Sequence, residues 1–352
     1  MIRAGGTGDG QRMRRRSLTL LIATVGVIAA LAVAVLLPVP YVILGPGPTL
    51  NTLGKTSGQP LISISGHVTY PTTGHLNMVT VGVQGGPGAN INIFTALTAW
   101  LNPHEAVVPE SELFTPGQTA EQTQQQDTQE MTGSQQTATA AALTQLHIPY
   151  QVVVAKAVKG YPAYGVLRAG DVITAVDGTP VTSESSLTSL INAHPAGTTL
   201  TLTIIRDGKT QTVRVATKES DGDKLIGVEI GEFKFPFSVK FNVGEIGGPS
   251  AGMMFALGII DKLTTMNLTG GRFIAGTGEI TASGQVQAIG GIQQKMVGAR
   301  DAGATVFLAP ASNCSDVEGA IPAGLEVVKV STLSQAVNDL ESLKAGRSVP
   351  SC

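Results

Sequence analysis

A serine in a glycine-rich segment has the setting that acyl-transfer chemistry requires. Ser250 lies in residues 244–252 (Gly-Glu-Ile-Gly-Gly-Pro-Ser-Ala-Gly), which lead into an apolar helix predicted over residues 250–262. The first turn of a helix leaves backbone N–H groups without partners, so a serine there has a nucleophilic oxygen beside donors for a developing oxyanion. Ordinary helix capping by Gly-Pro-Ser is the competing interpretation, and other residues must decide between them.

Lys295 is the candidate base for that serine. It lies on a second predicted helix, residues 292–302, on the same face as Ile292 and Ala299. Either its stem covers apolar surface while the ammonium reaches water, or burial keeps the amine neutral and able to take a proton from a serine. Lys262 is about 18 Å from Ser250 along their shared helix and cannot reach it.

A histidine is the alternative base. All five histidines precede residue 195, and a histidine from the segment 61–83 is the one that the fold could bring to Ser250. By spacing, Lys295 is the better candidate, because no histidine lies in the segment that carries Ser250.

Charge and motif content exclude several functions. The net charge of −2 gives no reason to expect a nucleic-acid partner. Two Gly-Lys-Thr tripeptides, 54–56 and 208–210, lack the first glycine of a phosphate-binding loop, because Thr49 and Thr203 occupy that position. We therefore expect no nucleotide, and we predict no cofactor and no metal ion.

The N-terminal segment predicts a membrane helix. Arg12, Arg14, Arg15 and Arg16 precede the uncharged run 18–37, which as a helix would span about 30 Å, the thickness of one bilayer core. The arginines place residues 1–17 in the cytoplasm and the bulk of the chain outside it. A cleaved signal peptide is the alternative, but this run is longer than a signal-peptide core and continues into apolar residues beyond Pro38.

The two cysteines, Cys314 and Cys352, suit one disulfide in a chain that lies outside the cytoplasm. Two free thiols are the alternative.

Periodicity gives a coarse order of elements before the serine segment. Residues 41–58 are rich in Gly, Pro and Thr and are predicted to be a linker. Alternating apolar residues predict a β-hairpin from strands 61–70 and 76–83, followed by a short helix over 90–100. The tract 119–147 is predicted to be one long helix with a largely polar surface.

The middle of the chain, residues 149–218, is rich in short β-type runs around one helix, 183–193. Within it, Gly160 to Gly178 resembles the PDZ domains of bacterial proteases, and residues 206–209 (Arg-Asp-Gly-Lys) supply a hairpin turn. The resemblance implies capture of an extended peptide terminus as an added strand, with a carboxylate-binding loop expected around Tyr150 to Val153. A spacer with the same fold and no ligand is the alternative.

The C-terminal part resembles the proteolytic domain of Lon proteases. The family's Gly-Pro-Ser-Ala-Gly motif matches residues 248–252, and its Ile-Gly-Gly-x-x-x-Lys motif matches residues 289–295. By resemblance, Ser250 is the nucleophile, Lys295 the general base, and Thr277 the threonine that hydrogen-bonds near the lysine. Gly248 and Ala251 flank the serine as supporting residues. Lon proteases usually carry an aspartate at the position of Gly247, so this chain departs from the family there.

Together these features predict an α+β chain, a Lon-type proteolytic domain with an inserted PDZ-like domain and an N-terminal transmembrane helix. The expected ranges are a basic N-terminus (1–17), a transmembrane helix (18–37), a linker (38–60), the first part of the protease domain (61–147), the PDZ-like domain (148–219) and the catalytic part (220–352).

That organisation resembles the membrane-anchored, PDZ-containing Lon-like proteases of bacteria. It implies an ATP-independent Ser–Lys endopeptidase that cleaves unfolded or flexible polypeptides outside the cytoplasm, and a homo-oligomer by analogy with Lon rings. Two other functions are weighed against it. One is a catalytically inert, membrane-tethered PDZ adaptor that regulates another protease. The other is a Ser–Lys carboxyl-terminal processing protease, which shares the PDZ element but not the serine motif.

Overall fold

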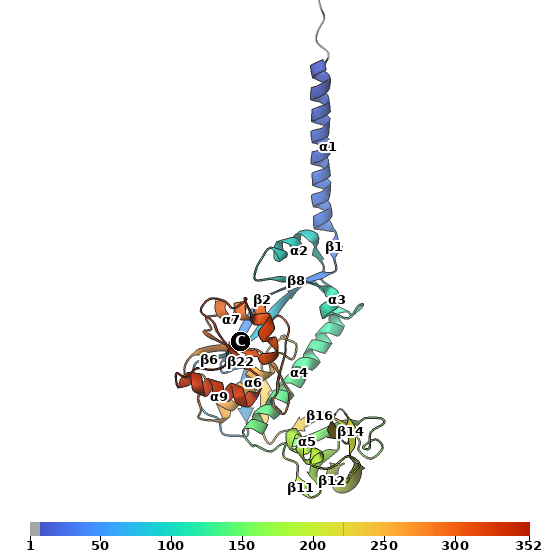
Figure 1. Cartoon of the computed structure of the whole chain (residues 1–352), viewed down its shortest axis with the longest axis vertical. Helices are drawn as coiled ribbons and strands as arrows, with labels where there is room; N and C mark the ends of the chain where they lie inside the picture. The colour runs from blue at the N-terminus through green and yellow to red at the C-terminus, as the bar shows by residue number, and fades with distance from the viewer. Residues whose placement is uncertain (1–7, 221) are drawn as a thin grey trace, which may run out of the picture. The chain divides into compact units, whose positions relative to one another are not determined.

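The chain forms two compact units joined by continuous segments. The computed structural model describes residues 8–220 and 222–352, so residues 1–7 of the predicted basic N-terminus lie outside the described part. The smaller unit comprises Met1–Gly45 with Gly82–Thr123, and the larger comprises Pro46–Val81 with Gln124–Cys352. Figure 1 traces the order of the elements along the chain by colour.

The smaller unit contains the predicted membrane helix. Helix α1 spans Gly8–Leu36, and its segment Ser17–Val35 is long and apolar enough to cross a membrane, with none of it buried. A signal sequence near an N-terminus passes the same test, so both interpretations stand. The other elements of this unit are β1 (Pro38–Val39), β7 (Ile91–Asn92), α2 (Ile93–Trp100), β8 (Ala106–Pro109) and α3 (Glu110–Leu113).

The predicted linker is in part a strand, which corrects the sequence analysis. Strand β2 covers Tyr41–Asn51, and Tyr41 to Leu44 pair antiparallel with β8. Glycine and proline can occur in a strand at positions where the backbone N–H is not needed for pairing with the neighbouring strand. Their presence in residues 41–58 therefore did not exclude a strand, and composition alone did not reveal it.

The larger unit is built on a parallel sheet. Strands β22 (Glu326–Val330), β21 (Val306–Pro310), β18 (Phe273–Gly276) and β6 (His75–Gln84) lie in that order, each parallel to its neighbour. Helix α6 (Gly252–Leu263) is buried along almost its whole length, as its apolar sequence predicts. The other helices of this unit are α4 (Ala120–Gln145), α5 (Glu184–Asn192), α7 (Ile292–Asp301), α8 (Cys314–Val317) and α9 (Leu333–Lys344).

The predicted hairpin between residues 61–70 and 76–83 is wrong. Strand β5 (Ile62–Ser65) pairs antiparallel with β17 (Ser238–Phe241), whereas β6 lies beside β18. The alternating pattern identified two strands correctly, but it carries no information about which strand each one pairs with. The partners are distant in sequence, so no local turn signal marks them.

The β-rich middle of the chain folds as an antiparallel sheet with α5 beside it. The order is β13 (Lys209–Ala216), β12 (Thr199–Arg206), β10 (Val172–Val176), β9 (Gln151–Ala157) and β16 (Val228–Lys234). Asp207 and Gly208 both have positive φ, 51° and 73°, as the predicted two-residue hairpin turn requires.

The carboxylate-binding loop expected around Tyr150 to Val153 is misplaced. These residues lead into β9, which is paired with β10 on one side and β16 on the other, so β9 offers no edge for an added strand. The sheet edge beside α5 belongs to β16, which arrives much later in the sequence.

Short elements complete the structure. They are β3 (Lys55–Thr56), β4 (Gln59–Pro60), β11 (Thr179–Pro180), β14 (Lys218–Ser220), β15 (Asp223–Leu225), β19 (Glu279–Ile280), β20 (Val286–Gln287) and the 3₁₀ turn η1 (Ala311–Asn313). Cys314 and Cys352 form a disulfide that closes a loop of 38 positions, with their Cα atoms 5.0 Å apart.

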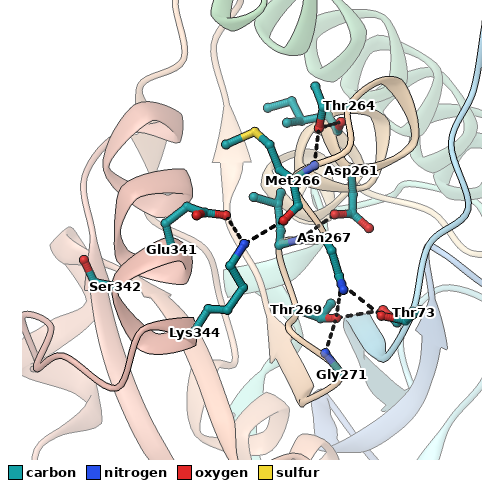
Figure 2. Close-up of polar contacts among 12 residues, drawn as sticks. Thr73, Asp261, Thr264, Met266, Asn267, Thr269, Gly271, Glu341, Ser342 and Lys344 are labelled. Carbon is teal, nitrogen blue, oxygen red and sulfur yellow. Dashed lines mark hydrogen bonds and ion pairs between the residues drawn. The ribbon is translucent and has the colours of Figure 1, made fainter.

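A polar network holds the loop that follows α6 (Figure 2). The Oδ1 atom of Asp261 accepts a bond from the N–H of Leu268 at 2.6 Å, and Lys344 of α9 donates to the carbonyl of Met266 and to Glu341, each at 2.6 Å. Thr269 donates to the carbonyl of Thr73 at 2.7 Å. Hydrogen bonds between side chains and backbone groups therefore hold this loop, in addition to apolar packing.

Candidate active site

Ser250 lies in a tight turn at the start of α6. The helix begins at Gly252, two residues later than expected, with Ala251 as its N-cap. Gly248 has a φ of +83°, a conformation that side chains with a Cβ rarely adopt, so glycine is needed at this point of the turn. The serine is therefore presented by a turn beside the helix N-terminus.

Lys295 reaches Ser250 from α7. Its Nζ atom donates to Ser250 Oγ at 2.9 Å and to Thr277 Oγ1 at 3.1 Å. Only 4 % of the lysine is exposed, and its neighbour Met296 is fully buried. The structure thus brings together the two residues that the sequence analysis singled out, and the lysine does not extend its amine into water.

Burial lowers the pKa of the Lys295 amine to about 8. An isolated ammonium in an apolar setting is costly, and both groups that receive its hydrogen bonds are neutral hydroxyls. At neutral pH roughly one tenth of such a lysine is uncharged, and this form can accept the serine proton.

Thr277 contacts both Ser250 and Lys295. It is fully buried, and its hydroxyl donates to the carbonyl oxygen of Ser250 at 3.0 Å while accepting from Lys295. The N–H of Gly278 donates to the same serine carbonyl at 2.8 Å. Two donors on one carbonyl restrict the backbone of Ser250, so the hydroxyl stays within reach of the amine.

The backbone around Ser250 provides donors for an oxyanion. Gly252 N donates to Pro249 O and Met253 N to Gly278 O, whereas the N–H groups of Ser250 and Ala251 donate to no group in the described ranges 8–220 and 222–352. The N–H of Gly248 is turned to the carbonyl of Asp127 and is not available. Of the residues expected to support the serine, Ala251 is the one with an unengaged donor.

Helix α4 braces the serine turn, a contribution that sequence reasoning missed. Ser134 donates to the carbonyl of Pro249 at 2.9 Å, and Asp127 O accepts from Gly248 N at 3.2 Å. A Cβ atom at Gly247 would lie 2.4 Å from the Cβ of Asp127. The side chain of Asp127 therefore occupies the space that a side chain at position 247 would need, which is why a glycine fits there.

The histidines proposed as alternative bases are engaged elsewhere. His67 packs against Phe237, with ring centroids 4.8 Å apart, and His75 stacks on Phe273 at 4.5 Å. The described residues also hold no group of three or more His, Cys, Asp and Glu side chains arranged for a metal ion.

Family models match two parts of the chain. The Lon protease (S16) C-terminal proteolytic domain matches residues 243–342, which contain both Ser250 and Lys295. A PDZ domain matches residues 122–217.

The curated relatives are Lon proteases that match over a short stretch. Lon protease 1 of Bacillus subtilis is 37 % identical over 93 residues, which is 26 % of this chain and 12 % of the relative. Lon protease 2 of Herpetosiphon aurantiacus is 46 % identical over 71 residues, 20 % of this chain and 8 % of the relative. The chain therefore matches about a tenth of the length of these relatives.

Two solved structures are similar to short parts of the chain. The PDZ domain of an SdrC-like protein from Listeria monocytogenes is 26 % identical, covers 22 % of this chain and 85 % of that one, and has a TM-score of 0.22. A solution structure from Geobacillus thermodenitrificans is 32 % identical, covers 21 % and 84 %, and has a TM-score of 0.20. On the family models and the Lon relatives, this chain combines a Lon-type proteolytic domain with a PDZ domain.

Proposed function

We propose that the chain is a serine endopeptidase that uses Ser250 and Lys295 as a catalytic dyad. The observation that carries the proposal is the 2.9 Å contact between a buried lysine amine and a serine hydroxyl. A lysine that burial holds partly neutral is a poor structural element and a good general base. The Lon-type proteolytic domain supports serine protease chemistry at this position.

The geometry assigns each group a step. The neutral amine of Lys295 takes the hydroxyl proton of Ser250, and the serine oxygen attacks the carbonyl carbon of a peptide bond. The N–H groups of Ser250 and Ala251 hold the negative oxygen that forms. The lysine then gives its proton to the leaving amine, and a water molecule hydrolyses the acyl-enzyme by the reverse sequence. Thr277 keeps amine and hydroxyl aligned through both halves.

Substrates are proposed to be unfolded or flexible polypeptides. Neither Gly-Lys-Thr tripeptide in this sequence belongs to a phosphate-binding loop, so the proposal assigns cleavage without ATP hydrolysis by this chain. Without a nucleotide-driven unfolding step, the chain would depend on segments that are already extended when they arrive. A homo-oligomer is proposed by analogy with Lon-type domains.

The PDZ domain is proposed to bind the C-terminus of a substrate or partner. A cavity of about 290 Å³ lies between β16 and α5 and is lined by Leu225 to Val228, Ile230, Leu187 and Ile191. Val228 and Ile230 share one face of β16, which suits alternate side chains of an added strand. The backbone just before β16, residues 225–228, replaces residues 150–153 as the proposed carboxylate-binding loop.

The proposed location is the outer face of a membrane, with α1 as a single anchor. The arginines before the apolar run support that orientation, and the Cys314–Cys352 disulfide is a bond that persists outside the cytoplasm. Alkylation of free thiols before and after reduction, in protein taken from cells, tests this part.

Cleavage and probe labelling separate this function from an inert adaptor. The full-length protein in detergent should degrade an unstructured polypeptide, and Ser250→Ala should abolish cleavage while leaving the thermal melting temperature nearly unchanged. A fluorophosphonate probe should label Ser250 in the wild type and fail to label the Lys295→Ala protein. Equal cleavage by wild type and Ser250→Ala would reject the dyad, and a folded wild type that neither cleaves nor labels would favour the adaptor.

A further inference from the structure

A second and larger cavity lies beside the PDZ groove and has no role in the chemistry described so far. Its volume is about 740 Å³, and its walls come from α4, β16 and the β19–β20 hairpin. The α4 wall consists of Thr128, Gln129, Thr132, Gly133, Gln136 and Thr137. Hydroxyl and amide groups dominate this wall, so it offers hydrogen bonds to a polypeptide backbone rather than an apolar contact surface.

The cavity adjoins the PDZ groove. Glu184 of α5 and Ile230 of β16 line both cavities. A peptide that adds to β16 runs antiparallel to it, so a C-terminus held at Gly227 and Val228 places the upstream residues toward Phe233. Phe233 lines the larger cavity, and the upstream part of a docked chain is thereby directed into it.

The β19–β20 part of the cavity wall lies next to residues that contact the serine turn. Glu279 and Ile280 line it and directly follow Gly278, whose N–H donates to the carbonyl of Ser250. A Cβ atom at Gly252, the first residue of α6, would lie 2.9 Å from Ile280. A chain that crosses the cavity from β16 would therefore approach residues that contact the turn carrying Ser250.

The charges in the cavity have one sign. Its described lining residues include the carboxylates Glu184, Glu232 and Glu279 and contain neither lysine nor arginine. Glu232 is exposed, whereas Glu184 and Glu279 are half-buried, and burial raises the pKa of Glu184. Like charges disfavour an acidic chain in this space, and opposite charges favour a basic one, more strongly at low salt.

We propose that this cavity holds the linking segment of a polypeptide substrate, the stretch between a C-terminus docked on β16 and the bond presented to Ser250, and that its glutamates select basic over acidic linking segments. The inference rests on the proposed function, because it names the substrate class that the PDZ groove and the dyad handle together. It assigns the PDZ domain a part in choosing which bond is cut, in addition to capturing the chain.

Binding to the Ser250→Ala protein tests the inference without requiring catalysis. Fluorescent peptides share one apolar C-terminus and one N-terminal region and differ only in a linking segment that carries two lysines, two serines or two glutamates. At low salt the lysine peptide should bind about tenfold more tightly than the glutamate peptide, with the serine peptide between them, and the difference should shrink in high salt. Amidation of the C-terminus should weaken all three.

Matched variants locate the effect. Glu232→Gln with Glu279→Gln should reduce the lysine-to-glutamate ratio to about twofold or less. Glu229→Gln removes one carboxylate charge from the same strand as Glu232, but Glu229 pairs with Lys156 at 3.0 Å and does not line the cavity, so this variant should keep the ratio. An unchanged ratio in the double variant, or an equal loss in Glu229→Gln, would overturn the proposal.

A photo-crosslinking residue in the linking segment gives a position-specific readout. Crosslinks should form to residues 128–137 of α4 or 279–287 of the hairpin. Crosslinks confined to other surfaces would reject the cavity even if wild-type cleavage depends on Ser250. Conversely, a wild-type protein that forms these crosslinks and selects the lysine peptide but never cleaves a substrate would support the binding path. That result would reject only the catalytic activity of the dyad.

Discussion

The polar side chains near the two ends of helix α6 have different kinds of hydrogen-bond partner. At the N-terminal end, the amine of Lys295 faces only the hydroxyls of Ser250 and Thr277. At the C-terminal end, Asp261 accepts a backbone N–H, and Lys262 donates to the carbonyl of Leu53 at 3.4 Å (Figure 2 shows the Asp261 network).

Burial lowers the pKa of both lysines, but Asp261 opposes the shift at Lys262, whereas Lys295 donates to two neutral hydroxyls. In the proposed mechanism, a desolvated lysine acts as a base where its partners are neutral and one of them is the attacking hydroxyl. At the other end of α6, Asp261 and Lys262 form hydrogen bonds with backbone groups.

Replacing each lysine by methionine should give the largest difference in activity between the two ends. Lys295→Met should lower kcat/KM for a peptide substrate by roughly 10³- to 10⁴-fold, because the general base is lost. Lys262→Met should change it by less than about threefold. Steady-state cleavage assays on the two folded proteins check this.

The melting temperature gives the control for those variants. Lowering the lysine pKa from 10.5 to about 8 corresponds to roughly 3 kcal/mol of penalty on the charged form, so Lys295→Met should melt at or above the wild type below pH 8. The advantage should fade as the pH rises through 8, where the folded protein already releases the proton. A strongly destabilised Lys295→Met protein would show that the lysine stabilises the fold.

The pH dependence of cleavage sharpens the same contrast. Only the neutral amine acts as a base, so log(kcat/KM) should rise with unit slope below pH 8 and level off above it, for a roughly 90-fold gain between pH 6 and pH 9. Stopped assays with a substrate that carries no titrating group check the profile. A rate that falls as the pH rises from 6 to 8 would contradict a lysine base.

A charge placed at Gly247 tests how α4 braces the dyad end. Gly247→Asp should lower kcat by about tenfold or more, because its Cβ would meet Asp127 at 2.4 Å and shift the serine turn. Adding Asp127→Gly should restore a large part of the loss by opening that space. A single variant with full activity, or a folded double variant with no recovery, would show that the contact is unimportant.

The Asp261 end should respond to pH through stability alone. Burial raises the pKa of Asp261, and its Oδ2 atom has no hydrogen-bond partner within residues 8–220 and 222–352. A raised carboxyl pKa contributes stability that is present at low pH and is lost as the pH rises through the folded value. Measured between pH 4.5 and 7.5, the melting temperature of Asp261→Asn relative to wild type should therefore increase with pH, with unchanged cleavage. A difference that stays constant across this range would contradict a titrating Asp261.

The sequence was most informative where function requires particular residues at fixed spacing. The Gly-Pro-Ser-Ala-Gly segment and the lysine after Gly290 and Gly291 predicted two side chains that the structure holds 2.9 Å apart. The long helix α4 and the helix α5 were also predicted close to their observed bounds, because their composition and caps are local signals.

Strand pairing was the part that local patterns could not give. Residues 62–65 pair with 238–241, on the far side of the whole PDZ domain in sequence. For the same reason the β16 edge was overlooked, since the residues before β9 resembled the start of a PDZ domain while the exposed edge comes last. The brace from Asp127 and Ser134 lies on a Gln- and Thr-rich helix whose sequence shows no chemical motif.

The route of the backbone after the PDZ sheet has a mechanical consequence. Strand β16 continues through Phe235 into β17 and then into the serine turn, and the rings of Phe233 and Phe235 both pack on Tyr150, with centroids 5.3 and 5.8 Å away. These ring contacts thus hold the start of β9 and the end of β16 together where the chain enters and leaves the PDZ sheet. A peptide that binds at the proposed PDZ groove and tilts β16 would act on the same uninterrupted stretch of polypeptide that carries Ser250, so we expect binding at one site to affect the other directly.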